Sequence, residues 1–295
     1  MVDRAGYGTT TGDHGDMVAA EAYELISPDG RLTARVEPGA GGRLVSLVVD
    51  GAEVIATCQG GYDADYFRGS FPMAPWCGLL TDGIVDFDGR RYELTGRTSP
   101  AGPKYYHGAV HSWPFEVLAQ TPTTIEQQIR IGPDQPDAWP WAGRVRHDYE
   151  LTDEKLVARL SVHSDGEEFP GAVGFHPWFV SHLGGDPARP ADIDFRPGQE
   201  LVRTADSHRE PTPEVGSTEN GLFIDLAAPP TISWPGGPTL QLESTAPVWV
   251  TYTHPEGGFC VEPWTSPDGP MDNTYVHRVT PDSPCTMEFV INISR

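Results

Sequence analysis

The sequence predicts an all-β fold, a large antiparallel β-sandwich. Short segments in which apolar and polar residues alternate recur along the chain, the pattern of strands with one buried face. No segment sustains the periodicity of an amphipathic helix. The 33 glycines and 29 prolines lie scattered between these segments without a repeat, as expected for turns that join many short strands.

The first strands are expected in hairpins. Residues 32–36 alternate, and residues 44–49 follow a glycine-rich turn. Asp50-Gly51 then closes a hairpin, and residues 53–55 continue the meander. Asp88-Gly89 predicts a second hairpin. Later strands are expected at residues 115–118, 124–131, 145–151, 156–162, 171–180, 222–226, 239–242, 248–253, 259–261 and 286–293.

Three segments depart from this pattern. Residues 62–81 are irregular and rich in aromatic residues and proline, which indicates a functional loop or a core plug. Residues 189–215 are rich in proline and aspartate and are predicted to form a surface excursion. A short helical turn is expected near residues 270–275.

We expect residues 1–20 to be a flexible N-terminal tail and residues 21–295 to form a single domain, because no linker separates two cores. The first 20 residues lack the apolar centre of a signal peptide, and no run of about 18 apolar residues predicts a membrane span. The four cysteines are far apart in sequence, which argues against zinc. Reduced thiols and a cytoplasmic location are the default expectation.

The formal net charge is −22, from 42 acidic and 20 basic residues. Such a surface repels nucleic acid and anionic membranes, so neither is expected as a partner. A small molecule is therefore the expected partner.

Residues 257–267 carry the first candidate for chemistry. Side chains alternate across a strand, so Cys260, Glu262 and Trp264 should share one face. Burying a carboxylate is costly and is tolerated mainly where it has partners or a raised pKa. Glu262 is therefore a candidate catalytic base; a structural glutamate that caps a turn is the alternative.

His176 lies in the apolar run Gly-Phe-His-Pro-Trp-Phe at residues 174–179. A buried core histidine is the simpler interpretation of such a position. However, Pro177 removes a ladder donor directly after it, which indicates a strand that ends at a pocket. A histidine can give and take a proton near neutral pH.

Four blocks together support a resemblance. Residues 71–78 (Phe-Pro-Met-Ala-Pro-Trp-Cys-Gly), His107-Gly108, residues 174–179 and residues 257–267 resemble, in order and spacing, the aldose 1-epimerase (galactose mutarotase-like) family. Residues 41–47 and 87–94 resemble its two opening hairpins, so the similarity runs from about residue 22 to the C-terminus. It implies one β-supersandwich domain that needs no cofactor.

The resemblance also implies roles for three residues: His176 as general acid, Glu262 as general base and His107 as a group that orients the sugar ring. We expect His176 and Glu262 to face each other across a sugar-sized hollow lined with indole rings. His111 follows four residues after His107, but an extended chain separates such residues by about 13 Å, too far to share a metal ion. Relatives commonly carry arginine where this chain has His111.

The expected sugar-binding residues are less regular. Trp76, Tyr106, Trp178 and Trp264 fall in matched blocks; we expect core packing to account for two of them, and favour Trp178 and Trp264 as pocket walls. Leu79 stands where relatives often have a binding arginine. Asn220 stands for their binding aspartate, with Asp225 as a displaced substitute.

The sequence thus predicts an aldose 1-epimerase that interconverts the anomers of a free aldose, as a monomer or homodimer without metal or cofactor. A hexose-6-phosphate epimerase of the same superfamily would need a cluster of arginine or lysine residues near the pocket, and the matched blocks supply little beyond Lys104, Arg68 and Arg97. A non-catalytic sugar-binding or sensor protein would suit the altered binding residues. A purely structural sandwich would not need paired titratable groups.

Overall fold

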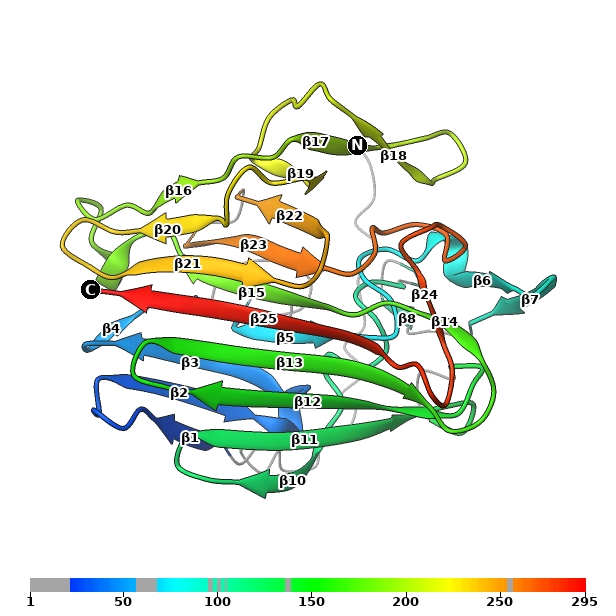
Figure 1. Cartoon of the computed structure of the whole chain (residues 1–295), viewed down its shortest axis with the longest axis horizontal. Helices are drawn as coiled ribbons and strands as arrows, with labels where there is room; N and C mark the ends of the chain where they lie inside the picture. Colours follow the sequence, from blue (N-terminus) through cyan, green and yellow to red (C-terminus); the bar gives the residue numbers. More distant parts are fainter. Residues whose placement is uncertain are drawn as a thin grey trace, which may run out of the picture.

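The computed structural model describes residues 22–56, 68–94, 98–99, 102–103, 105–135, 139–253 and 257–295. The predicted tail, Cys58, Arg97 and Lys104 lie outside these residues. Within them the fold is antiparallel β, which confirms the predicted fold class. Two large sheets lie face to face (Figure 1).

The larger sheet, called the site sheet below, has eleven strands among the described residues. In spatial order they are β1 (Tyr23–Ile26), β2 (Leu32–Glu37), β3 (Arg43–Val49), β5 (Ser70–Met73), β15 (Gly174–Val180), β23 (Gly258–Trp264), β22 (Val248–Tyr252), β19 (Asn220–Ile224), β17 (Gln199–Arg203) and β18 (Arg209–Thr212), with β4 (Ala52–Glu53) on β3.

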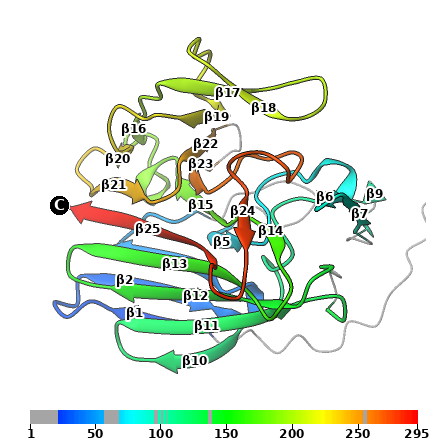
Figure 2. The same ribbon diagram turned by 45° about the vertical axis from the view of Figure 1, so that its right-hand side comes forward.

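The second sheet, called the cover sheet, has eight strands in the same part of the chain. Their order is β10 (Glu116–Gln120), β11 (Thr124–Ile131), β12 (Gly143–Leu151), β13 (Lys155–Ser164), β25 (Cys285–Ser294), β21 (Thr239–Ser244), β20 (Thr231–Ser233) and β16 (Asp192–Asp194). Three pairs stand apart: β14 (Phe169–Gly171) with β24 (His277–Val279), β6 (Ile84–Phe87) with β7 (Arg90–Glu93), and β8 (Thr98–Ser99) with β9 (Gly102–Pro103). The β6–β7 hairpin projects from one end of the molecule (Figures 1 and 2).

Strand alternation decides what each face of the site sheet contacts. On β15, Phe175 and Phe179 point into the main core between the sheets, where the Phe175 ring lies 5.9 Å from that of Phe289 on β25. The intervening His176 and Trp178 therefore point to the opposite face. A side chain on that face is set apart from the main core, and a functional site can form there.

Two local expectations need correction. Residues 270–275 form turns without helix, because Pro270 and the turn bonds around Asn273 replace a helical ladder. Residues 189–215 contain β16, β17 and β18, and the fully buried Leu201 joins this excursion to the site sheet. The helical pieces of the described chain are 3₁₀ turns: η1 (Pro38–Ala40), η3 (Thr81–Gly83) and η4 (Leu183–Gly185). None of the described helices is long and apolar enough to cross a membrane.

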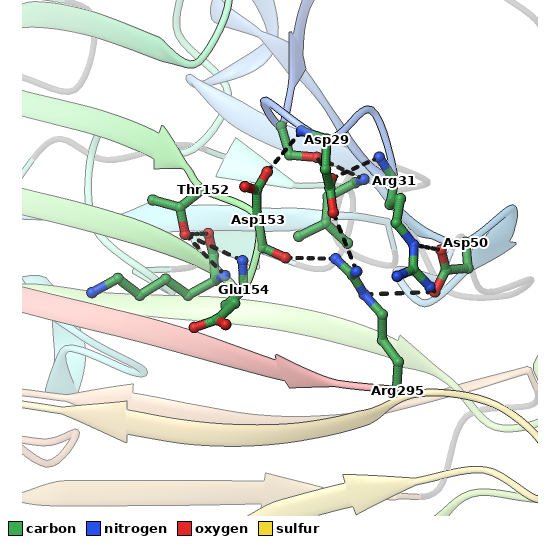
Figure 3. A network of polar contacts seen from close by, with 10 residues as sticks. Asp29, Arg31, Asp50, Thr152, Asp153, Glu154 and Arg295 are labelled. Atoms are coloured by element: carbon green, nitrogen blue, oxygen red, sulfur yellow. Dashed lines mark hydrogen bonds and ion pairs between the residues drawn. The ribbon is translucent and has the colours of Figure 1, made fainter.

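A polar network joins the sheets at the end where the chain terminates (Figure 3). Arg295 donates to the Asp153 carbonyl, 2.5 Å away, and to the Asp29 carboxylate, 3.3 Å away. Arg31 forms a two-point ion pair with Asp50, at 2.6 and 2.7 Å. These contacts connect the β1–β2 and β3–β4 turns of the site sheet with the β12–β13 turn of the cover sheet.

Candidate functional site

The site is built on adjacent antiparallel strands, β15 and β23. Gly174 pairs with Trp264 and Trp178 with Cys260, so this register places His176 opposite Glu262. On the other side, His176 pairs with Phe71 of β5. Three strands from distant parts of the sequence thus place one row of side chains across the face of the site sheet.

The two proposed proton-transfer groups are in contact. His176 Nε2 lies 3.5 Å from Glu262 Oε1, with 7 % and 2 % of the two side chains exposed. We expected them to face each other across a sugar-sized hollow; they do face each other, but no such gap lies between them. Neighbouring strands are too close for a sugar ring to separate directly opposed residues. A sugar would have to lie beside this pair.

Hydrogen bonds orient the carboxyl group and the imidazole. The Trp264 indole Nε1–H donates to Glu262 Oε2, at 3.0 Å. The other edge of the imidazole, at Nδ1, lies 3.5 Å from Cys260 Sγ. Phe71 stacks on the His176 ring with 4.6 Å between centroids. Both nitrogens and one face of the imidazole therefore have protein neighbours.

His107 reaches the same site from the loop before β10. Its ring centroid lies 4.9 Å from that of His176, at 89° between the ring planes, and its Nδ1 lies 3.0 Å from Met73 Sδ. Gly108 explains why the loop can approach so closely: its φ is 77°, and a Cβ there would lie 2.3 Å from the Ala74 carbonyl oxygen. Glycine at this position thus lets the loop that carries His107 pack closely against the backbone directly after β5.

A family model described as aldose 1-epimerase matches residues 24–186, which contain His107 and His176. The chain belongs to the aldose 1-epimerase family. No curated protein matches it at a significant level.

Solved structures show the same fold. A putative aldose 1-epimerase from Escherichia coli K12 is similar at a TM-score of 0.76 and 18 % identity, over 93 % of this chain and 99 % of that one. A galactose mutarotase-like protein from Clostridium acetobutylicum has a TM-score of 0.74 and 14 % identity, covering 94 % and 99 %. A galactose 1-epimerase from Lactobacillus acidophilus NCFM has a TM-score of 0.70 and 15 % identity, again covering 94 % and 99 %.

Burial controls protonation in this member of the aldose 1-epimerase family. It raises the pKa of Glu262 well above its usual range, against the smaller opposing effect of the Trp264 hydrogen bond. It also lowers the pKa of His176 well below its usual range, and His107 and Arg43 lower it further. Burial thus favours a neutral imidazole beside a protonated carboxyl group, and the contact geometry also suits an ion pair. The neutral pair and the ion pair contain the same protons and differ by one transfer between Glu262 and His176.

Burial also lowers the pKa of His107, to about 3, so this ring is neutral at physiological pH. A neutral imidazole can orient a sugar through hydrogen bonds without adding charge beside the pair.

The expected aromatic residues separate into three environments. Trp178 is buried 5.2 Å from the His176 ring, and Trp264 binds Glu262, so both are at the site. Tyr106 is 38 % exposed and lies 5.9 Å from the His107 ring, at the rim. Trp76 instead packs in the main core against Trp139, 5.6 Å away, so packing accounts for this residue.

The expected polar binding residues also separate. Asn220 begins β19 and pairs with Tyr252 of β22, which in turn pairs with Cys260. It therefore continues the row of Trp178 and Cys260 toward the exposed edge. Asp225 lies exposed beyond the other end of β19 and accepts a hydrogen bond from Gln199, so the structure does not bring it to the pair.

Several neighbours of the pair were not singled out as site residues from sequence. Phe71, Met73 and Tyr252 come from the site-sheet strands, and their alternation with core residues is the signal that could have located them. Cys260 was placed on the correct face, but its contact with His176 Nδ1 depends on how β23 meets β15.

His176, Cys260 and Glu262 are close enough to raise the question of a metal. The thiol, however, faces Nδ1 and the carboxyl group faces Nε2. An ion is bound in the ring plane by one imidazole nitrogen, and these two nitrogens point in divergent directions. One ion could not use all three groups as they are arranged.

Proposed function

We propose that this protein is a mutarotase that interconverts the α and β anomers of an aldose by acid–base catalysed ring opening. The observation that carries the proposal is the 3.5 Å contact between His176 Nε2 and Glu262 Oε1. The ring oxygen and the anomeric hydroxyl of a pyranose are bonded to the same carbon. An acid and a base that serve these two neighbouring oxygens can therefore lie close together, as these two groups do.

Ring opening starts from the ion-pair form. Glu262 removes the proton of the anomeric hydroxyl while His176 protonates the ring oxygen, the bond between the anomeric carbon and the ring oxygen breaks, and an aldehyde forms. This leaves a neutral imidazole and a protonated carboxyl group, the state that burial favours. The aldehyde rotates about its C1–C2 bond. Closure on the other face reverses both proton transfers and restores the ion pair.

Each group has support from its surroundings. A positioned acid or base typically contributes about 10²–10⁴-fold to the rate. The Trp264 N–H holds Glu262 Oε2 and leaves Oε1 toward His176. His107, with its ring edge-on to His176, is proposed to orient the sugar ring. Trp178 and Trp264 are proposed as apolar walls, with Tyr106 and Asn220 nearer the rim.

A phosphorylated hexose is the second candidate substrate, and one observation favours it. Arg203 and Arg209 of the β17–β18 hairpin both donate to the carboxylate of Asp268. A Cβ on Gly78 would lie 2.5 Å from Asp268 Cβ and 2.8 Å from Trp264 Cζ3, so Asp268 is next to the Trp264 indole. Two guanidinium groups on one carboxylate leave a net positive charge beside the site, which suits a phosphate.

A panel of sugars tests the proposal and separates its two substrates. Anomer exchange would be followed by NMR saturation transfer or polarimetry for free aldoses and their 6-phosphates, against the uncatalysed rate. We expect acceleration for at least one sugar. Binding without acceleration for every sugar would favour the non-catalytic sugar-binding alternative, and neither binding nor acceleration would contradict both.

A further inference from the structure

Cys260 contacts His176, the proposed acid, at the ring nitrogen that faces away from Glu262, the proposed base. Its Sγ lies 3.5 Å from His176 Nδ1, whereas Glu262 lies 3.5 Å from Nε2. Cys260 is a reduced thiol with 0 % exposure, and it pairs with Trp178 across the two strands. The thiol–imidazole–carboxyl order resembles that of a nucleophilic triad. A thiol buried this completely, however, acts most directly on the imidazole that it contacts.

The two protonation forms of the pair have one feature in common. In the ion pair, both nitrogens of the imidazolium carry hydrogen. In the neutral pair, the proton that has moved to Glu262 is donated back toward Nε2, so the remaining ring hydrogen is on Nδ1. Nδ1 therefore keeps its hydrogen throughout the cycle, and Nε2 alone gains and loses one.

That hydrogen needs an acceptor in a buried site, because an unsatisfied buried donor costs about 1–3 kcal/mol. Cys260 Sγ is in position to accept it. We propose that Cys260 is a positioning residue whose sulfur accepts the Nδ1–H of His176 and so fixes the tautomer in which Nε2 is the proton-exchanging nitrogen. This inference rests on the proposed function of the His176–Glu262 pair.

The other neighbours of the imidazole hold it differently. Phe71 stacks on one face, with 4.6 Å between centroids, and His107 meets the ring edge-on. Arg43 lies 4.8 Å from the centroid of that Phe71 ring, on β3. Arg43 disfavours the imidazolium through its charge, and a hydrogen bond with the backbone of His176 itself favours it. A neutral sulfur orients the ring without adding a negative charge that would oppose the effect of Arg43.

The tautomer can be measured without any sugar. The ¹⁵N shifts of His176, assigned with a His176→Gln variant, report which nitrogen carries hydrogen in the neutral ring. We expect a protonated-type shift at Nδ1 and an imine-type shift at Nε2. The reverse assignment would overturn the inference, whether or not the protein turns over a sugar.

Kinetics provide the second test, on a sugar that the wild-type protein turns over. Cys260→Ala should lower kcat about tenfold and leave KM unchanged, because one hydrogen bond is lost and no sugar contact is removed. Cys260→Ser, which restores an acceptor, should recover most of kcat. Cys285→Ala is the matched control, since it removes another buried thiol from the main core and should leave kcat unchanged. An unchanged kcat in Cys260→Ala, or a Cys260→Ser variant that folds and is no better than Cys260→Ala, would contradict the inference. Should Cys260→Ala not fold, the wild-type tautomer and Cys260→Ser decide the question.

Discussion

Trp264 donates its indole N–H to the carboxyl group of Glu262, two residues earlier on the same strand, at 3.0 Å. This bond lowers the pKa of a group whose pKa burial raises. Trp264 therefore favours the ionised form of Glu262 that the proposed ring opening requires.

The Trp264→Phe variant tests this role. It keeps an aromatic ring but removes the donor, so the pKa of Glu262 should rise further and a smaller fraction should be ionised. We expect kcat at pH 7 to fall about tenfold, as for one lost hydrogen bond, with a smaller change in KM. Trp234→Phe, which removes an indole N–H bond to the Val180 carbonyl in the main core, is the control. Equal kcat in wild type and Trp264→Phe would show that this bond does not support catalysis.

The pH dependence of kcat follows from the two opposite pKa shifts. The pair is active while it holds one transferable proton. In acid, His176 takes up a second proton, at a pKa below its ordinary value. In base, Glu262 loses the transferable proton, at a pKa above its ordinary value. We expect a bell-shaped profile whose acid limb comes from His176 and whose basic limb comes from Glu262. An NMR titration that assigns the acid limb to Glu262 and the basic limb to His176 would contradict the neutral pair.

Stability should fall in acid because the structure buries neutral histidines. Burial lowers the pKa of His107 and of His147 to about 3, and lowers that of His176 as well. Below about pH 6.5 the unfolded chain takes up protons that the folded chain does not, at about 1.4 kcal/mol for each such histidine and pH unit. Urea unfolding at pH 7 and pH 5 measures the loss. His147→Gln should lower the slope of stability against pH by about 1.4 kcal/mol per pH unit below pH 6.5, its share of the histidine contribution. An unchanged slope would mean that His147 is protonated in the fold.

Glu262 contributes with the opposite sign. Its folded pKa is raised, so the unfolded chain releases this proton first, and stability falls as the pH rises above about 4.3. Glu262→Gln removes that penalty. We therefore expect the variant to unfold at a higher urea concentration than wild type at pH 8, and the difference to shrink at pH 5. A less stable variant at pH 8 would indicate that Glu262 is ionised in the fold.

The network around Arg295 concerns the fold and not the site. Arg295→Ala removes the contacts with Asp29 and Asp153 that connect the two sheets. We expect a small decrease in the urea midpoint, reduced at high salt because exposed charges are screened, with kcat unchanged. A large change in kcat would show that this end of the molecule is coupled to the site.

Local pattern predicted much of this fold, because strand alternation and Asn/Asp-Gly turns act within a few residues. Asp50-Gly51 and Asp88-Gly89 lie at the hairpin turns where they were expected. The sequence predicts a surface excursion where the β17–β18 hairpin lies, because the burial of Leu201 depends on strands distant in sequence and on Phe71 and Trp264, which belong to the same buried cluster.

In the site, too, local patterns predicted some features, and contacts between distant strands determined the others. Alternation placed Cys260, Glu262 and Trp264 on one face, and the family resemblance brought in His176 and His107. The direct contact of His176 with Glu262 depends on the register between β15 and β23. These strands are distant in sequence: His176 and Cys260, for example, are 84 residues apart. The structure does not bring Asp225 to the pair, because it lies beyond the end of β19 opposite Asn220 and accepts a hydrogen bond from Gln199.

The most direct measurement is the rate of anomer exchange with Glu262→Gln, by NMR saturation transfer on the sugar that wild type turns over fastest, with the exposed Glu243→Gln as the control. Glutamine fills the same space and still accepts the Trp264 hydrogen bond, but it cannot take a proton. We expect the exchange rate to fall about 10²–10⁴-fold in a folded Glu262→Gln variant and to stay unchanged in the control. Exchange at the wild-type rate in Glu262→Gln would contradict it.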